Sequence, residues 1–411
     1  MQYQFNIPES IHGSVLLPSS KSLSNRALII YALTNKGILP TNLAQCDDTD
    51  VMVAALKSKE KEINIMAAGT AMRFLTAYLA ITPGERIITG TERMQMRPIH
   101  ILVDALKSLG ADISYLNKEG YPPLLIKGRR LEGNSLELKG DTSSQFITAL
   151  LLIAPQLPNG LTLNLKGDII SKPYIDMTIN LMNQCGAYAK WISDHQIEVL
   201  AQPYKPTILN IEPDWSAASY WFEWVALTKN SEIVLENIQL PSLQGDSKGA
   251  DLFKSVGVDY EIIEKGIRVY QTDKKVEKLE VNFIDIPDLA QTFAVTAALL
   301  DIPFHFTGLQ SLRIKETDRI DALICEMKKL GYLLQDVGDE ELIWDGNRTT
   351  PTDNPVIETY EDHRMAMSFA PASYIYPKLR IANPEVVTKS YPQYWEHLIR
   401  KNIEVIKTQK D

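Results

Sequence analysis

Polar and apolar positions follow one another along this chain in a pattern that repeats six times. A short polar stretch leads directly into an apolar stretch of helical length, and these helix starts lie at Ser22, Thr70, Ser143, Ser216, Asp288 and Asp362. Successive starts are about 48, 73, 73, 72 and 74 residues apart. A fixed period of this length indicates repeated supersecondary units. The shortfall in the first unit lies near residues 57–65, where the other units have room for extra strands.

Each unit is predicted to combine two kinds of helix with short strands. The first helix is apolar nearly all round, as in residues 27–33, which favours a buried position with sheets outside it. A second, amphipathic helix ends at a glycine in several units, over residues 98–110, 173–186, 248–257 and 317–331. Alternating runs over residues 135–138, 161–165, 233–235 and 266–270 predict strands.

Two domains of three units each would use the whole chain of 411 residues. We therefore expect an α/β protein that forms a two-domain inside-out α/β barrel. Each lobe would contain three repeated strand-and-helix units, with the helices buried and the sheets outside. Residues 17–20 and 211–214, each with one proline, are candidate linkers.

The composition is that of an ordinary soluble protein, with 45% hydrophobic and 23% charged residues. The net charge is −9 and no long basic run is present, which argues against non-specific nucleic-acid binding. The longest apolar run, residues 146–154, is far shorter than the roughly 20 residues of a membrane span. Because no signal peptide is visible, we expect a cytoplasmic protein that does not bind membranes.

Three cysteines, Cys46, Cys185 and Cys325, are too widely spaced for a CxxC or zinc-binding motif. We expect them to be buried small hydrophobic residues in a reducing compartment. The six histidines show no paired spacing, so no metal site is predicted.

Residues 314–319 place five polar side chains at the start of an apolar helix. Lys315 and Arg319 are four apart and would share one helical face, where like charges repel by a few tenths of a kcal/mol. Two cations beside Glu316 at a helix start instead indicate an anion-binding site with an acid or base next to it.

Nine cations recur at equivalent places in this acidic chain: Lys21, Arg26, Arg73, Arg97, Lys172, Lys315, Arg319, Arg364 and Lys389. Several come just before a proline and a helix, which would fix them at the helix start, where anions bind. Any one of them alone is more simply a solvated side chain, and a lone helix-start serine is usually an N-cap. The tryptophan-rich helix start near Trp215 is more simply core. The coincidence of nine cations favours one anionic site.

The motifs that carry a resemblance extend over most of the chain, at residues 20–26, 68–73, 97–99, 143–146, 171–176, 286–288, 315–319 and 362–367. Together they resemble the 5-enolpyruvylshikimate-3-phosphate synthase family. The resemblance implies two lobes with the active site in the cleft between them. Residues 1–20 plus 213–411 would form the first lobe, completed by both chain ends, and residues 21–212 the second. It implies transfer of the enolpyruvyl group from phosphoenolpyruvate to the 5-hydroxyl of shikimate 3-phosphate with release of phosphate, by a monomer without metal or cofactor.

The resemblance also assigns roles to residues. Catalytic roles fall to Asp288, Glu316 and Lys21. Shikimate 3-phosphate would contact Lys21, Ser22, Arg26, Ser143, Ser144, Gln145, Ser171, Tyr174, Asp288, Ser311 and Lys315. Phosphoenolpyruvate would contact Lys21, Gly69, Arg97, Gln145, Arg319, Arg364 and Lys389.

The chain departs from the family pattern at three positions. Ala67 stands where an asparagine is usual, Phe74 where many members have proline, and Ser311 where many have asparagine. Three other readings stay open: a UDP-N-acetylglucosamine enolpyruvyl transferase, a non-catalytic anion-binding relative, and a DNA-encircling clamp built from six units. No cysteine lies in the reactive-loop motif of the first, and the net charge of −9 disfavours the last.

Overall fold

The computed structural model describes residues 1–409. The chain forms two compact units. Unit 1 contains Met1–Pro18 and the chain from Glu212 onward, and unit 2 is Ser19–Ile211. Unit 1 is therefore discontinuous in sequence, and the chain passes from one unit to the other twice. No helix among the described residues is long and apolar enough to cross a membrane.

Three inner helices form the centre of unit 1. They are α8 (Trp215–Leu227), α10 (Ala290–Leu299) and α12 (His363–Phe369). Every residue of α10 is buried, and in α8 only Ser216 is not. Helices that are apolar on all sides must be covered on all sides, so the prediction of buried helices is confirmed.

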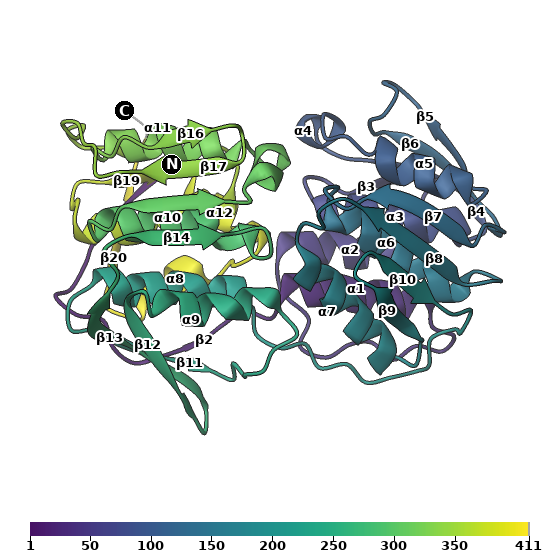
Figure 1. Cartoon of the computed structure of the whole chain (residues 1–411), viewed down its shortest axis with the longest axis horizontal. Coiled ribbons are helices and arrows are strands. Elements are labelled where there is room, and N and C mark those ends of the chain that lie inside the picture. Colours follow the sequence, from purple (N-terminus) through teal and green to yellow (C-terminus); the bar gives the residue numbers. More distant parts are fainter. Residues whose placement is uncertain (410–411) are drawn as a thin grey trace. The chain divides into compact units, whose positions relative to one another are not determined.

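Three four-stranded sheets belong to unit 1 (Figure 1). In spatial order they are β2 (Ser14–Leu16), β11 (Glu232–Glu236), β13 (Gly266–Lys275) and β12 (Val256–Ile263); β14 (Leu279–Asn282), β15 (Phe304–Thr307), β17 (Glu341–Trp344) and β16 (Gln335–Val337); and β18 (Val356–Ile357), β19 (Arg380–Ala382), β1 (Gln2–Asn6) and β20 (Glu404–Thr408).

The sheets of unit 1 share one pairing scheme, which is direct support for the sequence repeat. In each, the first pair of strands is parallel and the other two pairs are antiparallel. Parallel strands require a long crossover. In the second and third sheets the inner helix, α10 or α12, lies in that connection, and in the first sheet the whole of unit 2 and α8 lie between β2 and β11. In the third sheet the N-terminal strand β1 lies between the C-terminal strands β19 and β20. Both chain ends thus complete this sheet, as the resemblance implied.

Outer helices pack on the sheets of unit 1. They are α9 (Gly249–Phe253), α11 (Arg319–Lys329) and α13 (Tyr394–Ile399), with 3₁₀ turns η2 (Gly245–Lys248), η3 (Pro287–Leu289), η4 (Gln310–Ile314), η5 (Ala370–Tyr374) and η6 (Pro384–Lys389). The expectation of a helix through residue 257 is wrong, because α9 ends at Phe253 and Gly257 lies in β12. Gly257 has φ +88° beside a register shift in the β12–β13 pairing, so this glycine serves a β-bulge.

Unit 2 repeats the same plan with one sheet fewer. Its inner helices are α1 (Lys21–Leu33), α3 (Gly69–Ile81) and α6 (Ser144–Ile153), and its other helical segments are α2 (Asp47–Lys57), α4 (Glu92–Gln95), α5 (His100–Ser108), α7 (Lys172–Gln184) and η1 (Ala154–Gln156). Its sheets are β3 (Glu62–Asn64), β4 (Gly84–Thr89), β6 (Leu124–Gly128) and β5 (Asp112–Tyr115), then β7 (Ser135–Lys139), β8 (Leu161–Lys166), β10 (Gln196–Val199) and β9 (Ala189–Ser193).

The short first repeat explains the missing sheet. Where a third sheet was expected in unit 2, residues 1–409 contain a single bridge between Thr41 and Asn210. The segment that carries Asn210 includes Pro203, Pro206 and Pro213, which lack the backbone donor that a strand ladder needs. The inside-out α/β architecture holds, but its third outer face in unit 2 is made of irregular chain.

Two further expectations about buried residues can be compared with the structure. Trp215, Trp221 and Trp224 are buried in the core of unit 1, as predicted. Cys46 and Cys185 are buried, but Cys325 is exposed, so that part of the cysteine prediction is wrong. Cys325 lies on α11, an amphipathic helix with one face toward solvent.

Candidate active site

The charged motif near residue 316 lies before a helix rather than inside it. Helix α11 begins at Arg319, where Asp318 is the N-cap and accepts hydrogen bonds from the backbone N–H groups of Ile320 and Asp321. Lys315 follows the 3₁₀ turn η4 and has an extended backbone. The prediction that Lys315 and Arg319 share a helical face is therefore wrong, because Asp318 caps the helix after Lys315.

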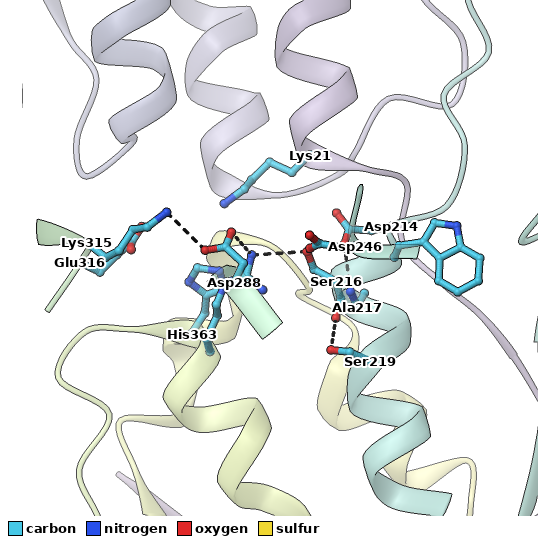
Figure 2. A network of polar contacts seen from close by, with 12 residues as sticks. Lys21, Asp214, Ser216, Ala217, Ser219, Asp246, Asp288, Lys315, Glu316 and His363 are labelled. Atoms are coloured by element: carbon cyan, nitrogen blue, oxygen red, sulfur yellow. Dashed lines mark hydrogen bonds and ion pairs between the residues drawn. The ribbon is translucent and has the colours of Figure 1, made fainter. Parts of the chain in front are cut away.

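Asp288 is the centre of a cluster of cations. It lies in η3, directly before α10, and one of its carboxylate oxygens is 3.3 Å from Lys315 Nζ (Figure 2). The carboxylate is also 3.0 Å from Arg319 Nη1 and 2.7 Å from Arg364 Nη2. Burial by itself raises the pKa of Asp288, but Arg364, Lys315 and Arg319 together outweigh burial and hold the pKa well below its usual range. Asp288 is therefore an ionised acceptor at neutral pH.

Glu316 is the second acidic group of this cluster. Its carboxylate is 3.1 Å from Arg319 Nη2 and 3.1 Å from Lys389 Nζ. Lys389 ends η6, and its side chain is 12% exposed. Two carboxylates and four cations thus form one connected network in unit 1, and each carboxylate shares Arg319.

The start of α12 is tied to this network. Asp362 is the N-cap of α12 and accepts a hydrogen bond of 2.9 Å from the backbone N–H of Arg364. Its carboxylate also accepts from Arg319 Nε at 2.7 Å. His363, the first residue of the helix, is 2% exposed. Helix α12 thereby fixes the backbone from which Arg364 reaches Asp288.

The sequence analysis assigned no site role to Tyr220, Ser216 and Asp246, which lie around Arg364. Arg364 Nη1 donates to Tyr220 Oη at 3.3 Å, and Nη2 approaches Ser216 Oγ at 3.5 Å. Ser216 in turn donates to the carboxylate of Asp246, a residue of η2 that is 4% exposed (Figure 2). Burial, with the nearby charge of Asp288, raises the pKa of Asp246 to about 6. The available signal was the polar run at residues 244–248, before the second helix of its unit.

In unit 2 the start of α1 carries an ion pair that the sequence analysis also missed. Lys21 Nζ lies 3.0 Å from Asp48 Oδ2, and the Asp48 side chain is 6% exposed. Asp48 is in the first turn of α2, next to Asp47. The acidic run at residues 47–50 looked like ordinary helix-start charge, which explains why it was overlooked.

Gly69 brings two arginines close to the start of α3. A Cβ atom at this position would lie 2.6 Å from Arg73 Nη1 and 2.7 Å from Arg97 Nη1. Arg73 Nη1 donates to the Gly69 carbonyl at 2.9 Å. Gln145, from the start of α6, donates to Thr70 Oγ1 at 3.2 Å. The predicted residues Gly69, Arg97 and Gln145 therefore belong to one region of unit 2.

Arg26 is held by hydroxyl and carbonyl oxygens. It donates to Thr178 Oγ1 and to the Ser22 carbonyl at 2.8 Å each, and to Thr148 Oγ1 and the Tyr174 carbonyl at 3.4 and 3.3 Å. No carboxylate is among these acceptors, and burial lowers the pKa of Arg26 to about 10. A buried guanidinium among neutral acceptors is suited to bind an anion.

The remaining predicted residues lie at helix starts or in turns. Ser143 is the N-cap of α6, which begins at Ser144, and Ser171 precedes α7 with a left-handed backbone at φ 55°. The Ser311 Oγ atom, in η4, is buried without a hydrogen-bond partner within residues 1–409. Lys172 differs from expectation, because its Nζ lies 4.7 Å from the centre of the Trp191 ring. Its charge interacts with an aromatic face.

The described part of the chain contains no group of three or more His, Cys, Asp or Glu side chains that could hold a metal ion. Paired carboxylates among cations can move protons next to bound anions.

Comparisons with solved structures identify the fold. An EPSP synthase from Acinetobacter baumannii superposes with a TM-score of 0.77, at 20% identity, over 99% of this chain and 100% of the other. The enolpyruvyl transferase NikO from Streptomyces tendae superposes with a TM-score of 0.76, at 13% identity, over 100% of this chain and 99% of the other. At these identities the likeness shows the fold, which is that of enolpyruvyl transferases.

The sequence comparisons narrow the class to a family. The family model described as EPSP synthase (3-phosphoshikimate 1-carboxyvinyltransferase) matches residues 5–62 and 57–398. A 3-phosphoshikimate 1-carboxyvinyltransferase from Bacteroides fragilis is 56% identical over 398 residues, which cover 97% of each chain. The chain belongs to the EPSP synthase family, and the resemblance found in its motifs is confirmed.

Proposed function

We propose that the chain transfers the enolpyruvyl group from phosphoenolpyruvate to the 5-hydroxyl of shikimate 3-phosphate and releases phosphate. One observation supports this proposal above the others: the ionised Asp288 carboxylate lies among Lys315, Arg319 and Arg364. The two substrates carry two carboxylates and two phosphates between them. Binding four anionic groups close together requires many fixed cations, and the family to which the chain belongs has this activity as its description.

Proton transfer in this reaction is assigned to two residues. Asp288 accepts the proton of the attacking hydroxyl, and Lys315, 3.3 Å from it, holds the hydroxyl and the carboxylate together. Glu316 exchanges a proton with the methylene carbon. Its contacts with Arg319 and Lys389 keep it at a fixed position. General acid and base groups of this kind contribute about 10²–10⁴-fold each to the rate.

The binding of phosphoenolpyruvate is assigned to five cations, together with Gly69 and Gln145. Several of the cations pair with a carboxylate that the substrate could replace. Arg319, Arg364 and Lys389 in unit 1, and Lys21, Gly69, Arg97 and Gln145 in unit 2, form this set. The Lys21 ammonium contacts Asp48, which is one such partner. Lys21 also assists at the leaving phosphate, because an ammonium group stabilises the negative charge that develops there.

The binding of shikimate 3-phosphate is assigned to the neutral donors and to Arg26. Ser22, Ser143, Ser144, Ser171 and Tyr174 in unit 2 would contact it, with Lys21 and Gln145. Ser311, whose Oγ atom is buried without a partner in the described residues, would contribute from unit 1.

Transfer of the enolpyruvyl group to a UDP-sugar is a second function that this fold could support. The environments of the three cysteine side chains disfavour it. A cysteine that forms a covalent adduct needs thiolate character and access. Burial raises the pKa of Cys46 and brings that of Cys185 to about 11. Cys325 is exposed, but it lies on α11, well inside a regular helix.

The direct test is an assay of phosphate release with both substrates, followed by mass spectrometry of the product. We expect release only when both are present, with a product heavier than shikimate 3-phosphate by one enolpyruvyl group. Release with UDP-N-acetylglucosamine in place of shikimate 3-phosphate would favour the second reading. Binding of both ligands without release would indicate a non-catalytic relative.

The state of the protein in the cell is part of the proposal. We infer a cytoplasmic monomer, because the composition is that of a soluble protein and both substrates are small charged metabolites. Light scattering during size-exclusion chromatography should give a mass near 46.3 kDa, whereas a mass near twice that value would contradict the monomer.

A further inference from the structure

Asp246 is a buried carboxyl group that none of the roles above uses. It is 4% exposed and accepts a hydrogen bond from Ser216, the one residue of α8 that is not buried. Ser216 Oγ in turn lies 3.5 Å from Arg364 Nη2. A hydroxyl that donates to one group can accept from another, so Ser216 links the carboxyl of Asp246 to the guanidinium of Arg364.

The same guanidinium atom carries the contact with Asp288. Arg364 Nη2 lies 2.7 Å from Asp288 Oδ2 and is therefore shared between Asp288 and Ser216. Tyr220 holds the other amino group at 3.3 Å. The groups that face Asp246 from the surrounding elements are Asp288, Arg364, Ser216 and Asp214. Two of these are carboxylates and one is a cation, so the ionisation of Asp246 changes the local charge balance around Arg364.

We propose that Asp246 positions Arg364 through Ser216 and, by its own charge, makes anion binding at that arginine depend on the protonation of this buried carboxyl group. This inference rests on the proposed function, in which Arg364 binds phosphoenolpyruvate. When Asp246 is protonated, the charge of Arg364 is available to the substrate. When Asp246 ionises, it adds a negative charge near the incoming anion, and affinity falls. Binding of the anion therefore takes up a proton at Asp246.

Burial and the charge of Asp288 bring the protonation of Asp246 into a pH range in which the protein can be assayed. They raise the pKa of Asp246 to about 6, and a second anion beside Arg364 would raise it further. Each unit of pKa change on binding corresponds to about a tenfold change in affinity between the two protonation states. The effect should thus be visible between about pH 5.5 and 8.

The variants Asp246→Asn and Ser216→Ala separate charge from position. Asparagine keeps an acceptor for Ser216 and stays neutral at every pH. We expect Asp246→Asn to match the wild type at pH 5.5 and to show a lower KM for phosphoenolpyruvate at pH 8, with kcat within about threefold. Ser216→Ala should raise that KM at every pH and keep the pH dependence. Asp251→Asn, a control on the exposed side of α9, should change neither quantity.

Calorimetry decides the inference together with the pH profile of KM. Calorimetric titration of phosphoenolpyruvate in buffers of different ionisation enthalpy gives the number of protons taken up on binding. Subtracting the number found for Asp246→Asn from the number found for the wild type removes the contribution of protons that the ligand itself takes up. A positive difference near pH 7 is expected, and no difference would overturn the inference. Equal weakening of Asp246→Asn at all pH values would show a merely structural role. A wild-type protein that neither binds phosphoenolpyruvate nor releases phosphate would contradict both the proposed function and this inference. An active wild type whose pH dependence of KM is the same as that of Asp246→Asn would contradict the inference alone.

Discussion

Arg319 and Asp362 form a buried ion pair that joins the start of α11 to the start of α12. Arg319 Nε and Asp362 Oδ2 are 2.7 Å apart, and the two side chains are 2% and 0% exposed. Asp362 also caps α12, while Arg319 contacts both Asp288 and Glu316. The pair therefore fixes the position of the charged network of unit 1 relative to the start of α12.

Breaking this pair should destabilise the protein as well as its site. In Asp362→Asn the buried Arg319 guanidinium keeps a neutral acceptor at this position but loses the most deeply buried of its three carboxylate partners. Removal of one partner from a buried pair typically costs about 3–5 kcal/mol. Urea unfolding followed by tryptophan fluorescence measures this loss mainly in unit 1, because Trp191 is the single tryptophan outside it.

The matched control for that experiment is Asp321→Asn on the exposed side of the same helix. Asp321 pairs with Arg313, and its side chain is 66% exposed. Exposed pairs contribute about 0–1 kcal/mol, so the control should unfold close to the wild type. Equal losses in the two variants would mean that burial of the Arg319–Asp362 pair has no special importance.

The two proposed proton-transfer residues should fail in different ways. Asp288→Asn and Glu316→Gln each remove a carboxylate while keeping its shape, and we expect kcat to fall about 10²–10⁴-fold in both. Asp288 contacts three cations and Glu316 contacts two, so KM should also change in both variants and should change more in Asp288→Asn. Stopped-flow and steady-state measurements of phosphate release give both constants. Near-normal turnover in either variant removes that residue from its role.

Much of this site could be read from the sequence because its signals are local. The change from polar to apolar residues marks each inner helix start, and the cations at those starts were identified before their contacts were known. Asp48 and Asp246 were missed for the opposite reason. An acidic residue in a helix's first turn is common, and only tertiary structure shows that Asp48 reaches Lys21 and that Asp246 reaches Ser216.

Two errors in the fold have equally physical causes. The start of α11 was placed too early because charge spacing was read as helical, although Asp318 is the stronger cap. Gly257 was read as a helix stop, but a glycine with positive φ also suits a β-bulge. The spacing of apolar and polar residues predicts which helices and strands exist. The residues at which they end depend on which of two competing local hydrogen-bonding patterns is stabilised by tertiary packing.

Gly69 should be a sensitive position for the binding of phosphoenolpyruvate. In Gly69→Ala the new Cβ would lie under 3 Å from the terminal nitrogens of both Arg73 and Arg97. These are the mobile ends of long side chains, so the arginines should shift while the fold survives. We expect a rise in KM for phosphoenolpyruvate of about tenfold or more, since a displaced bidentate contact costs about 1.5–3 kcal/mol.

The same alanine placed at another glycine of unit 2 provides the control. A methyl group added at Gly167 would have no heavy atom within 4 Å, although the φ of 73° at this residue adds backbone strain. Gly167→Ala should therefore lower the melting temperature slightly and leave KM unchanged. If Gly69→Ala shows the lower melting temperature and an unchanged KM instead, Gly69 has a structural role and does not shape the site.

The core of unit 1 contains a titratable group whose effect on stability depends on pH. Glu223 on α8 is 0% exposed and accepts a hydrogen bond of 3.2 Å from Thr296 on α10. Burial raises the pKa of Glu223 well above its usual value, so the folded protein favours the protonated form of this carboxyl group. In the unfolded chain the same group ionises above about pH 4.3.

The sign of the pH effect follows from proton binding. Between those two pKa values the folded state binds more protons at Glu223 than the unfolded state, so stability falls as pH rises through that window. Glu223→Gln cannot ionise, and its melting temperature relative to the wild type should therefore increase from pH 5 to pH 8. Scanning fluorimetry across this range measures the difference, with Glu396→Gln on α13 as an exposed control whose side chain is 67% accessible. A difference between Glu223→Gln and wild type that stays constant with pH would show that Glu223 is ionised in the folded core.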